Sequence, residues 1–184
     1  MGNKIKKQIK IIATKSAEKS VFFRNIYRGL LNTYRLIMYK IRTAGIKVDK
    51  HTIIFSCFNG QSYTCSPKAL YEYMIKSSEY DEYKFVWCFK DVEKYKFLEE
   101  NKNTVVVKQG SKKYQQYLAK AKYWIFNYKI PDYLKPKKEQ VFLQCWHGTP
   151  LKRLGCDLTH FDNVLNTAEG MKKRYKIEAS KFSY

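Results

Sequence analysis

Apolar and β-branched residues fill the stretch Thr52-Ile53-Ile54-Phe55-Ser56-Cys57-Phe58, and the turn residues Asn59-Gly60 follow directly. A short apolar run that ends in a turn signal predicts a buried strand. The pair Ser66-Pro67 then predicts the start of a helix, with Ser66 as the N-cap residue and Pro67 at the first helical position. Strand, turn and helix in this order form the first half of a βαβ unit.

The same alternation continues toward residue 146. Helical patterns separate most of the further strand-like runs, which cover residues 83–89, 104–107, 122–127 and 140–146. Ser111 stands where it can cap one of these helices. Strands that alternate with helices favour right-handed crossovers and a mainly parallel sheet with helices on both faces. We therefore predict an α/β, Rossmann-like domain over residues 51–165.

Positive charge is concentrated in the first quarter of the chain. The 184 residues carry 36 Lys and Arg against 16 Asp and Glu, a net charge of +20. Residues 1–50 hold 13 of these cations but only Glu18 and Asp49 as acids, which gives +11. Such an excess indicates an arm that meets an anionic surface, either nucleic acid or lipid. No RNP-like or helix-turn-helix signature is present, so we expect no nucleic-acid partner.

Residues 21–42 have a helical period with two opposite faces, one basic and one apolar. The basic face holds Arg24, Arg28, Arg35 and Arg42, and the apolar face holds Phe23, Ile26, Leu30, Tyr34, Ile37 and Ile41. In one interpretation the apolar face packs on the core and the arginines are solvated. In the other, the apolar face enters lipid headgroups while basic residues meet anionic phosphates. We expect residues 1–50 to be a basic amphipathic helical segment that associates with anionic membranes.

The set of side chains best suited to chemistry follows the last predicted strand. After Val141-Phe142-Leu143 the chain reads Gln144-Cys145-Trp146-His147-Gly148-Thr149-Pro150-Leu151-Lys152-Arg153. The crevice outside the carboxyl ends of the strands is where ligands bind in an α/β sheet. There the sequence places an imidazole, a flexible glycine, a hydroxyl and two cations. These are the groups needed to deprotonate a hydroxyl and to hold a phosphate.

The residues Trp146-His147-Gly148-Thr149-Pro150-Leu151-Lys152 resemble the signature of the CDP-glycerol:poly(glycerophosphate) glycerophosphotransferases, which build teichoic acids and related capsule polymers in bacteria. The resemblance includes three earlier stretches: Phe58-Asn59-Gly60-Gln61-Ser62-Tyr63, Pro67-Lys68-Ala69-Leu70-Tyr71-Glu72 and Ala121-Lys122-Tyr123-Trp124-Ile125-Phe126-Asn127. It implies that the terminal hydroxyl of a lipid-linked glycerol-phosphate polymer attacks the β-phosphorus of CDP-glycerol and expels CMP. It also implies that His147 is the base, which suits an imidazole that titrates near neutral pH.

Other residues are candidates to bind the acceptor or its phosphates. Gly148 can bring backbone N–H groups close to a phosphate and Thr149 can donate a hydrogen bond. Lys152 and Arg153 can neutralise acceptor phosphates, or form a solvated charged pair.

Two positions outside this stretch are also candidates. Asn59 and Gly60 are expected at the same crevice, although a tight turn alone would explain an Asn-Gly pair. Asp157 is a candidate to orient the His147 ring, or is a surface acid.

The family has two Rossmann-like domains that face a cleft, in the GT-B arrangement, with the nucleotide-binding residues in the C-terminal half. The resemblance therefore implies that residues 51–165 are the acceptor-side domain of the N-terminal half. Residues 166–184 are expected to form a helix that leads toward a missing C-terminal donor domain, where CDP-glycerol would bind. We expect no cofactor, and no metal because no His/Asp/Glu cluster has ligand spacing.

The expected function is that of a glycerophosphotransferase, or its N-terminal portion, bound peripherally at the cytoplasmic face of the cell membrane. Five cysteines without a Cys-x-x-Cys motif fit a reducing compartment. No uncharged apolar run approaches the roughly 18 residues that span a bilayer. The alternative is a non-catalytic membrane-bound module that binds a polymer or a partner enzyme and lacks a donor site.

Overall fold

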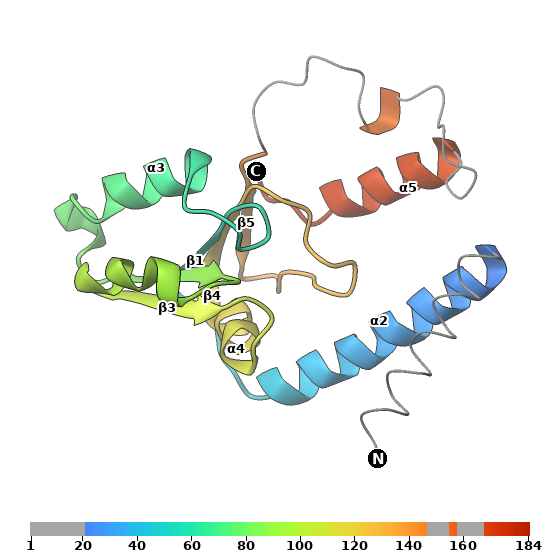
Figure 1. The fold of residues 1–184 in the computed structure, drawn as a ribbon, viewed down its shortest axis with the longest axis horizontal. Coiled ribbons are helices and arrows are strands. Elements are labelled where there is room, and N and C mark those ends of the chain that lie inside the picture. Colours follow the sequence, from blue (N-terminus) through green and yellow to red (C-terminus); the bar gives the residue numbers. More distant parts are fainter. Residues whose placement is uncertain (1–20, 147–154, 158–167) are drawn as a thin grey trace.

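A central sheet with helices around it organises the molecule (Figure 1). The computed structural model describes residues 21–146, 155–157 and 168–184. Its described strands are β1 (Asp49–Ser56), β2 (Lys84–Phe89), β3 (Thr104–Lys108), β4 (Ala121–Phe126) and β5 (Val141–Gln144). They form one sheet in the order β3-β2-β1-β4-β5, and each neighbouring pair is parallel. The predicted Rossmann-like α/β fold is confirmed.

Helices cover both faces of this sheet. On one face lie α3 (Cys65–Met74), the short 3-10 helix η1 (Ser78–Tyr80) and the 3-10 helix η2 (Glu93–Glu100), and there Tyr71 packs with Phe55 and Trp87. On the other face α4 (Lys112–Lys120) contributes Leu118 to a core that includes Trp124. Side chains alternate between the two faces along each strand, so every strand feeds both cores. This explains why the strands read as nearly continuous apolar runs.

The two predicted helix starts have different outcomes. Ser111 caps α4 as predicted, because its hydroxyl accepts a hydrogen bond from the backbone N–H of Tyr114 at 3.1 Å. The other prediction is wrong, since α3 begins at Cys65 and its N-cap residue is Thr64 rather than Ser66. A proline fits anywhere in the first turn, where backbone N–H groups have no partner within the helix. Pro67 therefore indicates a helix start but does not fix its first residue.

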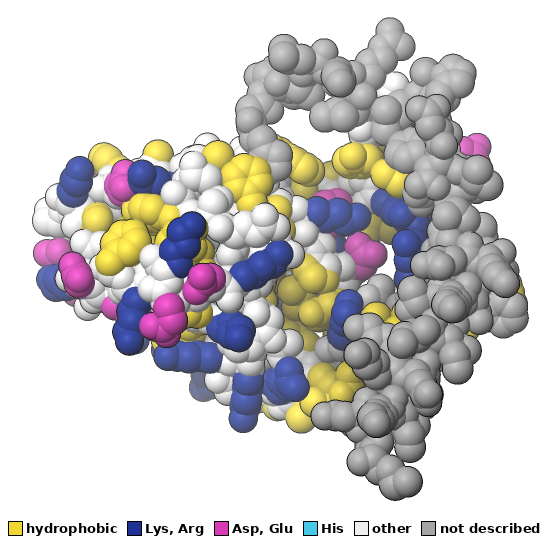
Figure 2. All heavy atoms as spheres, in the orientation of Figure 1, with side chains coloured by type: hydrophobic (Ala, Val, Ile, Leu, Met, Phe, Trp, Pro, Cys, Tyr) yellow, Lys and Arg dark blue, Asp and Glu magenta, His cyan; other side chains and the backbone are white. Residues whose placement is uncertain are grey.

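A long helix lies beside the sheet. Helix α2 (Val21–Thr43) ends next to α4, where Arg42 Nη1 donates to Gln115 Oε1 at 3.1 Å (Figure 1). Figure 2 shows Lys and Arg side chains spread over the visible face and around the hollow between the sheet and α2. None of the described helices is both long and apolar enough to cross a bilayer. The predicted segment limits at 50/51 and 165/166 stay predictions, and β1 begins two residues before the first of them.

The last described residues return to the sheet after helix α5 (Ala168–Ala179). Ser183 N donates to Phe142 O at 2.8 Å, and Gln144 N donates to Tyr184 O at 3.1 Å. These contacts place the backbone of residues 183 and 184 alongside β5, in the same direction. Helix α5 is thereby held at the β5 side of the sheet.

Candidate functional site

Three adjacent strands end at the edge where the sequence predicts the site. Phe126, the last residue of β4, is paired with Ser56 of β1 on one side and with Gln144 of β5 on the other. The residues that follow these strands are therefore neighbours, because parallel strands end at the same edge. The described chain reaches Trp146 at this edge. His147, Gly148, Thr149, Lys152 and Arg153 lie outside the described residues, so their roles stay predictions.

The turn after β1 has an unusual backbone. Phe58, Asn59 and Gly60 have φ values of 46°, 57° and 77°, all in the left-handed region. This is why the strand ends at Ser56 and does not reach residue 58 as predicted. Asn127, the buried residue that follows β4, stabilises the turn, because its Oδ1 accepts a hydrogen bond from Phe58 N at 2.8 Å.

The predicted site residues Asn59 and Gly60 have different surroundings. Gly60 N donates to Cys57 O within the turn at 2.9 Å, and Gly60 O accepts from Lys90 N, directly after β2, at 2.7 Å, so both of its backbone polar groups are engaged. The side chain of Asn59 is exposed, and its Oδ1 accepts from Gln109 Nε2 at 3.1 Å. The geometry therefore gives Gly60 a structural role and leaves Asn59 accessible to a ligand.

We expect Gly60→Ala to lower the free energy of unfolding by about 1–3 kcal/mol, because an L-residue is strained at this positive φ. Its added Cβ would also lie 3.1 Å from Lys90 N and 3.2 Å from Cys88 O. Urea denaturation measures the change. The matched control is Gly110→Ala, where φ is +78° but nothing lies within 4 Å of the added Cβ. Equal losses in the two variants would show that crowding at Gly60 contributes nothing.

A polar cluster around Gln109 contacts the side chain of Asn59. The Nε2 of Gln109 lies 3.0 Å from the phenol oxygen of Tyr128, 3.2 Å from that of Tyr114 and 3.1 Å from Asn59 Oδ1, and its two hydrogens are shared among these three acceptors. Burial raises the pKa of both phenols above the ordinary value, so the two tyrosines stay protonated at neutral pH. Asn127 Nδ2, also buried, has no hydrogen-bond partner among the described residues. The described edge thus offers amides and neutral hydroxyls, which bind and orient.

The sequence pattern did not reveal this cluster. Asn127 stands out only as part of a stretch that resembles the family, and no local motif marks Gln109. Gln109 lies 50 residues from Asn59, and Asn127 lies 69 residues from Phe58. The one sequence feature that indicates the cluster is the position of Gln109 directly after β3 and of Asn127 directly after β4. Residues that follow parallel strands meet at the carboxyl edge of the sheet.

Asp157 and Trp146 lie on either side of the undescribed stretch. Asp157 is exposed at the end of the short 3-10 helix η3 (Gly155–Asp157). Its predicted role toward His147 stays a prediction. The Trp146 ring is 41% exposed and makes an edge-to-face contact with Phe182, with 5.9 Å between ring centroids. Trp146 is therefore partly covered by Phe182 and partly open to solvent where the described segment 21–146 ends.

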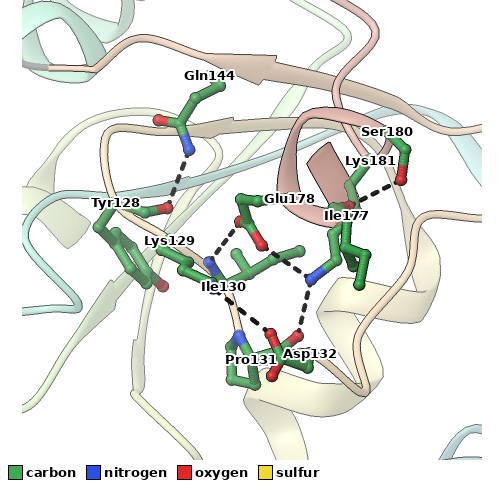
Figure 3. Close-up of polar contacts among 10 residues, drawn as sticks. All are labelled: Tyr128, Lys129, Ile130, Pro131, Asp132, Gln144, Ile177, Glu178, Ser180 and Lys181. Carbon is green, nitrogen blue, oxygen red and sulfur yellow. Dashed lines mark hydrogen bonds and ion pairs between the residues drawn. The ribbon is translucent and has the colours of Figure 1, made fainter. Parts of the chain in front are cut away.

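A buried ion pair fixes the loop that follows β4 (Figure 3). Lys181 Nζ lies 3.0 Å from Glu178 Oε2, and both side chains are buried. Glu178 Oε1 accepts from Ile130 N at 3.1 Å, and Lys181 Nζ donates to Pro131 O at 3.3 Å. The end of α5 is therefore connected directly to the loop beyond Asn127. Across the described part of the chain, no group of three His, Cys, Asp or Glu side chains is placed to hold a metal ion.

The family model of the CDP-glycerol:poly(glycerophosphate) glycerophosphotransferases matches residues 37–183. The chain belongs to this family. The match includes the whole described sheet and the Trp-His-Gly stretch, so the resemblance inferred from residues 146–152 is confirmed. In this glycerophosphotransferase family member, Asn59 and Gly60 lie at the described edge of the sheet. They are the two binding candidates that the sequence predicts outside the Trp-His-Gly stretch.

Relatives of this glycerophosphotransferase family member include polymerases of teichoic acid. The teichoic acid poly(glycerol phosphate) polymerase of Staphylococcus epidermidis is 33% identical, over 100% of this chain and 24% of its own length. The polymerase of the same name from Bacillus spizizenii is 30% identical, over 86% of this chain and 39% of its own. The wall teichoic acid polymerase TagF, in a variant soaked with CDPG, has a TM-score of 0.69 and 30% identity, over 88% and 40%. The chain spans less than half the length of these relatives.

Proposed function

We propose that this chain is the acceptor-side portion of a glycerophosphotransferase. The enzyme would transfer glycerol phosphate from CDP-glycerol to the terminal hydroxyl of a lipid-linked poly(glycerol phosphate) and release CMP. The match of residues 37–183 to the family model carries this proposal. The TagF structure soaked with CDPG supports the choice of donor. The donor is expected on the nucleotide-binding half that the family resemblance implies, outside the part of the relatives that this chain spans.

In this mechanism His147 takes the proton of the acceptor hydroxyl as the oxygen attacks the β-phosphorus. A new P–O bond forms, the P–O bond to the bridging oxygen breaks, and CMP leaves with the electron pair. Gly148, Thr149, Lys152 and Arg153 are proposed to hold the phosphates during this step. Asn59, which is exposed and supported by Gln109, is proposed to orient the acceptor. The neutral Tyr114 and Tyr128 phenols are poorly suited to act as the base, which favours His147 in that role.

The test of the function is CMP release from CDP-glycerol in the presence of a lipid-linked glycerol-phosphate primer. The protein is expressed from the longest open reading frame that contains these 184 residues, and in parallel as the 184 residues alone. Primer-dependent CMP release by the longer protein supports the proposal. Primer binding without CMP release in both forms would instead favour the alternative, a non-catalytic membrane-bound polymer- or partner-binding module.

We further propose that the chain binds peripherally to anionic membranes at the cytoplasmic face. The support comes from α2, whose apolar face does not pack on the core. Leu30 is 68% exposed and Ile41 65% exposed, and Ile26, Tyr34 and Ile37 are exposed beside them. Of the two interpretations left open by the sequence, this geometry favours insertion of the apolar face into lipid headgroups. The lysines that precede α2 in the sequence would add attraction to anionic lipids.

We expect Leu30→Ser with Ile37→Ser to lower binding to phosphatidylglycerol vesicles at least tenfold. Full burial of one such side chain contributes about 1.5–3 kcal/mol. Two partly buried side chains together should therefore contribute more than the roughly 1.4 kcal/mol that corresponds to a tenfold change in affinity. Vesicle flotation of the full chain measures the effect. The matched control is Phe97→Ser, which removes an equally exposed apolar side chain from η2 and should leave flotation unchanged. Full flotation of the double variant would contradict the membrane role of α2.

A further inference from the structure

A basic groove of about 440 Å³ lies between helix α2 and the loop after β4. Arg28 and Arg35 of α2 form one wall, Lys129 and Asp132 form the other, and Asn59 lies in the lining with them. Figure 2 shows a hollow beside the sheet in which Lys and Arg side chains lie together with acidic ones. The groove therefore shares Asn59 with the candidate acceptor site at the carboxyl edge of the sheet.

The charges of the groove favour an anionic ligand. Asp132, its one lining acid, is already paired with Lys129 at 3.6 Å. Within the described residues neither Arg28 nor Arg35 has a carboxylate at ion-pair distance, and both are exposed. Guanidinium groups bind phosphate oxygens with paired, charge-assisted hydrogen bonds. Two such groups on one wall are suited to phosphates rather than to a neutral sugar.

The arrangement along α2 fits a chain of phosphates. At about 1.5 Å per residue, Arg28 and Arg35 lie about 10 Å apart along the helix axis. At about 100° per residue they lie within about 20° of the same line, so both face the groove. This spacing suits separate phosphates of one linear molecule. The side chain of Asn59 gives such a molecule a polar contact at the edge where the predicted chemistry takes place.

The groove and the exposed apolar face lie on opposite sides of α2. Leu30 and Ile37 are roughly 160–180° away from Arg28 around the helix. If the apolar face meets lipid, these arginines point away from the bilayer surface and toward the sheet. A lipid headgroup is thus a poorer fit than the phosphodiester chain of a polymer that extends from the membrane.

The opposite wall is fixed in place before any ligand binds. The buried Glu178–Lys181 pair holds Ile130 N and Pro131 O, and Ile130 and Pro131 also line the groove. A wall held in this way loses little conformational entropy when a ligand binds. The loop that carries Lys129 is therefore held to the end of α5 (Figure 3).

We propose that this groove binds the phosphodiester backbone of the acceptor polymer, with Arg28, Arg35 and Lys129 contacting phosphates that precede the reactive end. The proposal rests on the proposed function, because it assigns a second contact region to the same acceptor. It adds residues of α2 to acceptor binding, so the helix would serve lipid with one face and polymer with the other.

The experiment measures binding of a soluble synthetic glycerol phosphate oligomer to the full chain by titration calorimetry, without CDP-glycerol. We expect R28Q/R35Q to weaken this binding about tenfold, and to lower flotation with phosphatidylglycerol vesicles no more than a control that removes the same charge elsewhere. The matched control is K84Q/K96Q, which removes the same charge at the start of β2 and in η2, outside the groove. This control should change oligomer binding less than twofold, because it alters only the overall field.

Two outcomes would overturn the proposal. Equal losses in R28Q/R35Q and K84Q/K96Q would mean that the net charge of the chain, and not the groove, attracts the oligomer. Loss of vesicle flotation in R28Q/R35Q with unchanged oligomer binding would make lipid headgroups the ligand. The proposed transferase function fails separately, since absent CMP release with groove-dependent oligomer binding would leave the groove assignment intact.

Discussion

His147→Ala is expected to lower CMP release by about 10² to 10⁴-fold in a form of the protein that has a donor site. A glycerol hydroxyl is a poor nucleophile at neutral pH until a base takes its proton, and an imidazole is well matched to that task. His147 comes three residues after Gln144, the last residue of β5, at the edge where β1 and β4 also end. The described residues at that edge are better suited to bind than to accept a proton, so we expect no other side chain to replace His147.

Two measurements separate a base from a binding residue. CDP-glycerol affinity should be nearly unchanged in His147→Ala, because the donor is expected on the other half of the enzyme. His147→Gln keeps a hydrogen-bonding group but cannot accept the proton, so it should be equally inactive. The matched control is His51→Ala, which removes an exposed histidine near the start of β1, at the other end of that strand. Near-normal turnover of His147→Ala would end the assignment of His147 as the base.

Glu178→Ala is expected to lower the free energy of unfolding by about 3–5 kcal/mol, because it leaves the buried Lys181 ammonium without its partner. It also removes the acceptor of Ile130 N, a buried backbone group that would then be unsatisfied. Both losses occur at the connection between α5 and the loop after β4. Urea denaturation followed by circular dichroism measures the change.

The nearby Lys129–Asp132 pair provides a matched control, since it has the same i, i+3 spacing but is exposed. Asp132→Ala should cost no more than about 1 kcal/mol. Replacing both buried partners, as in Glu178→Met with Lys181→Met, should restore much of the stability, because neither charge remains buried alone. A small effect of Glu178→Ala would mean that Lys181 reaches water in its absence and that α5 is held mainly by the Ser183 and Tyr184 contacts with β5.

Local sequence was sufficient for the alternation of strand and helix. Each buried strand is a run of apolar residues, and Ser111 provides the N-terminal acceptor that starts α4. These signals act over a few residues, so they can be recognised without knowing the partners of a segment. The predicted strand ends differ from the observed ones where the backbone turns early, as at Phe58 and Asn59. Their left-handed conformation is supported by Asn127, a residue far away in the sequence.

The Trp-His-Gly stretch likewise identified the family, because its seven residues are contiguous. Contacts between distant segments could not be read in this way. The order β3-β2-β1-β4-β5 brings Asn59, Gln109 and Asn127 to one edge. The burial of Glu178 with Lys181 depends on where α5 meets the loop after β4.

The orientation of α2 shows most clearly which features depend on local sequence and which depend on tertiary packing. Its sequence specifies an apolar and a basic face, but either face of an amphipathic helix can turn toward the protein. Packing places the basic face beside α4 and the Lys129–Asp132 loop, and leaves Leu30 and Ile41 exposed. Periodicity is a property of the helix alone, whereas the choice of face depends on the surfaces that surround it.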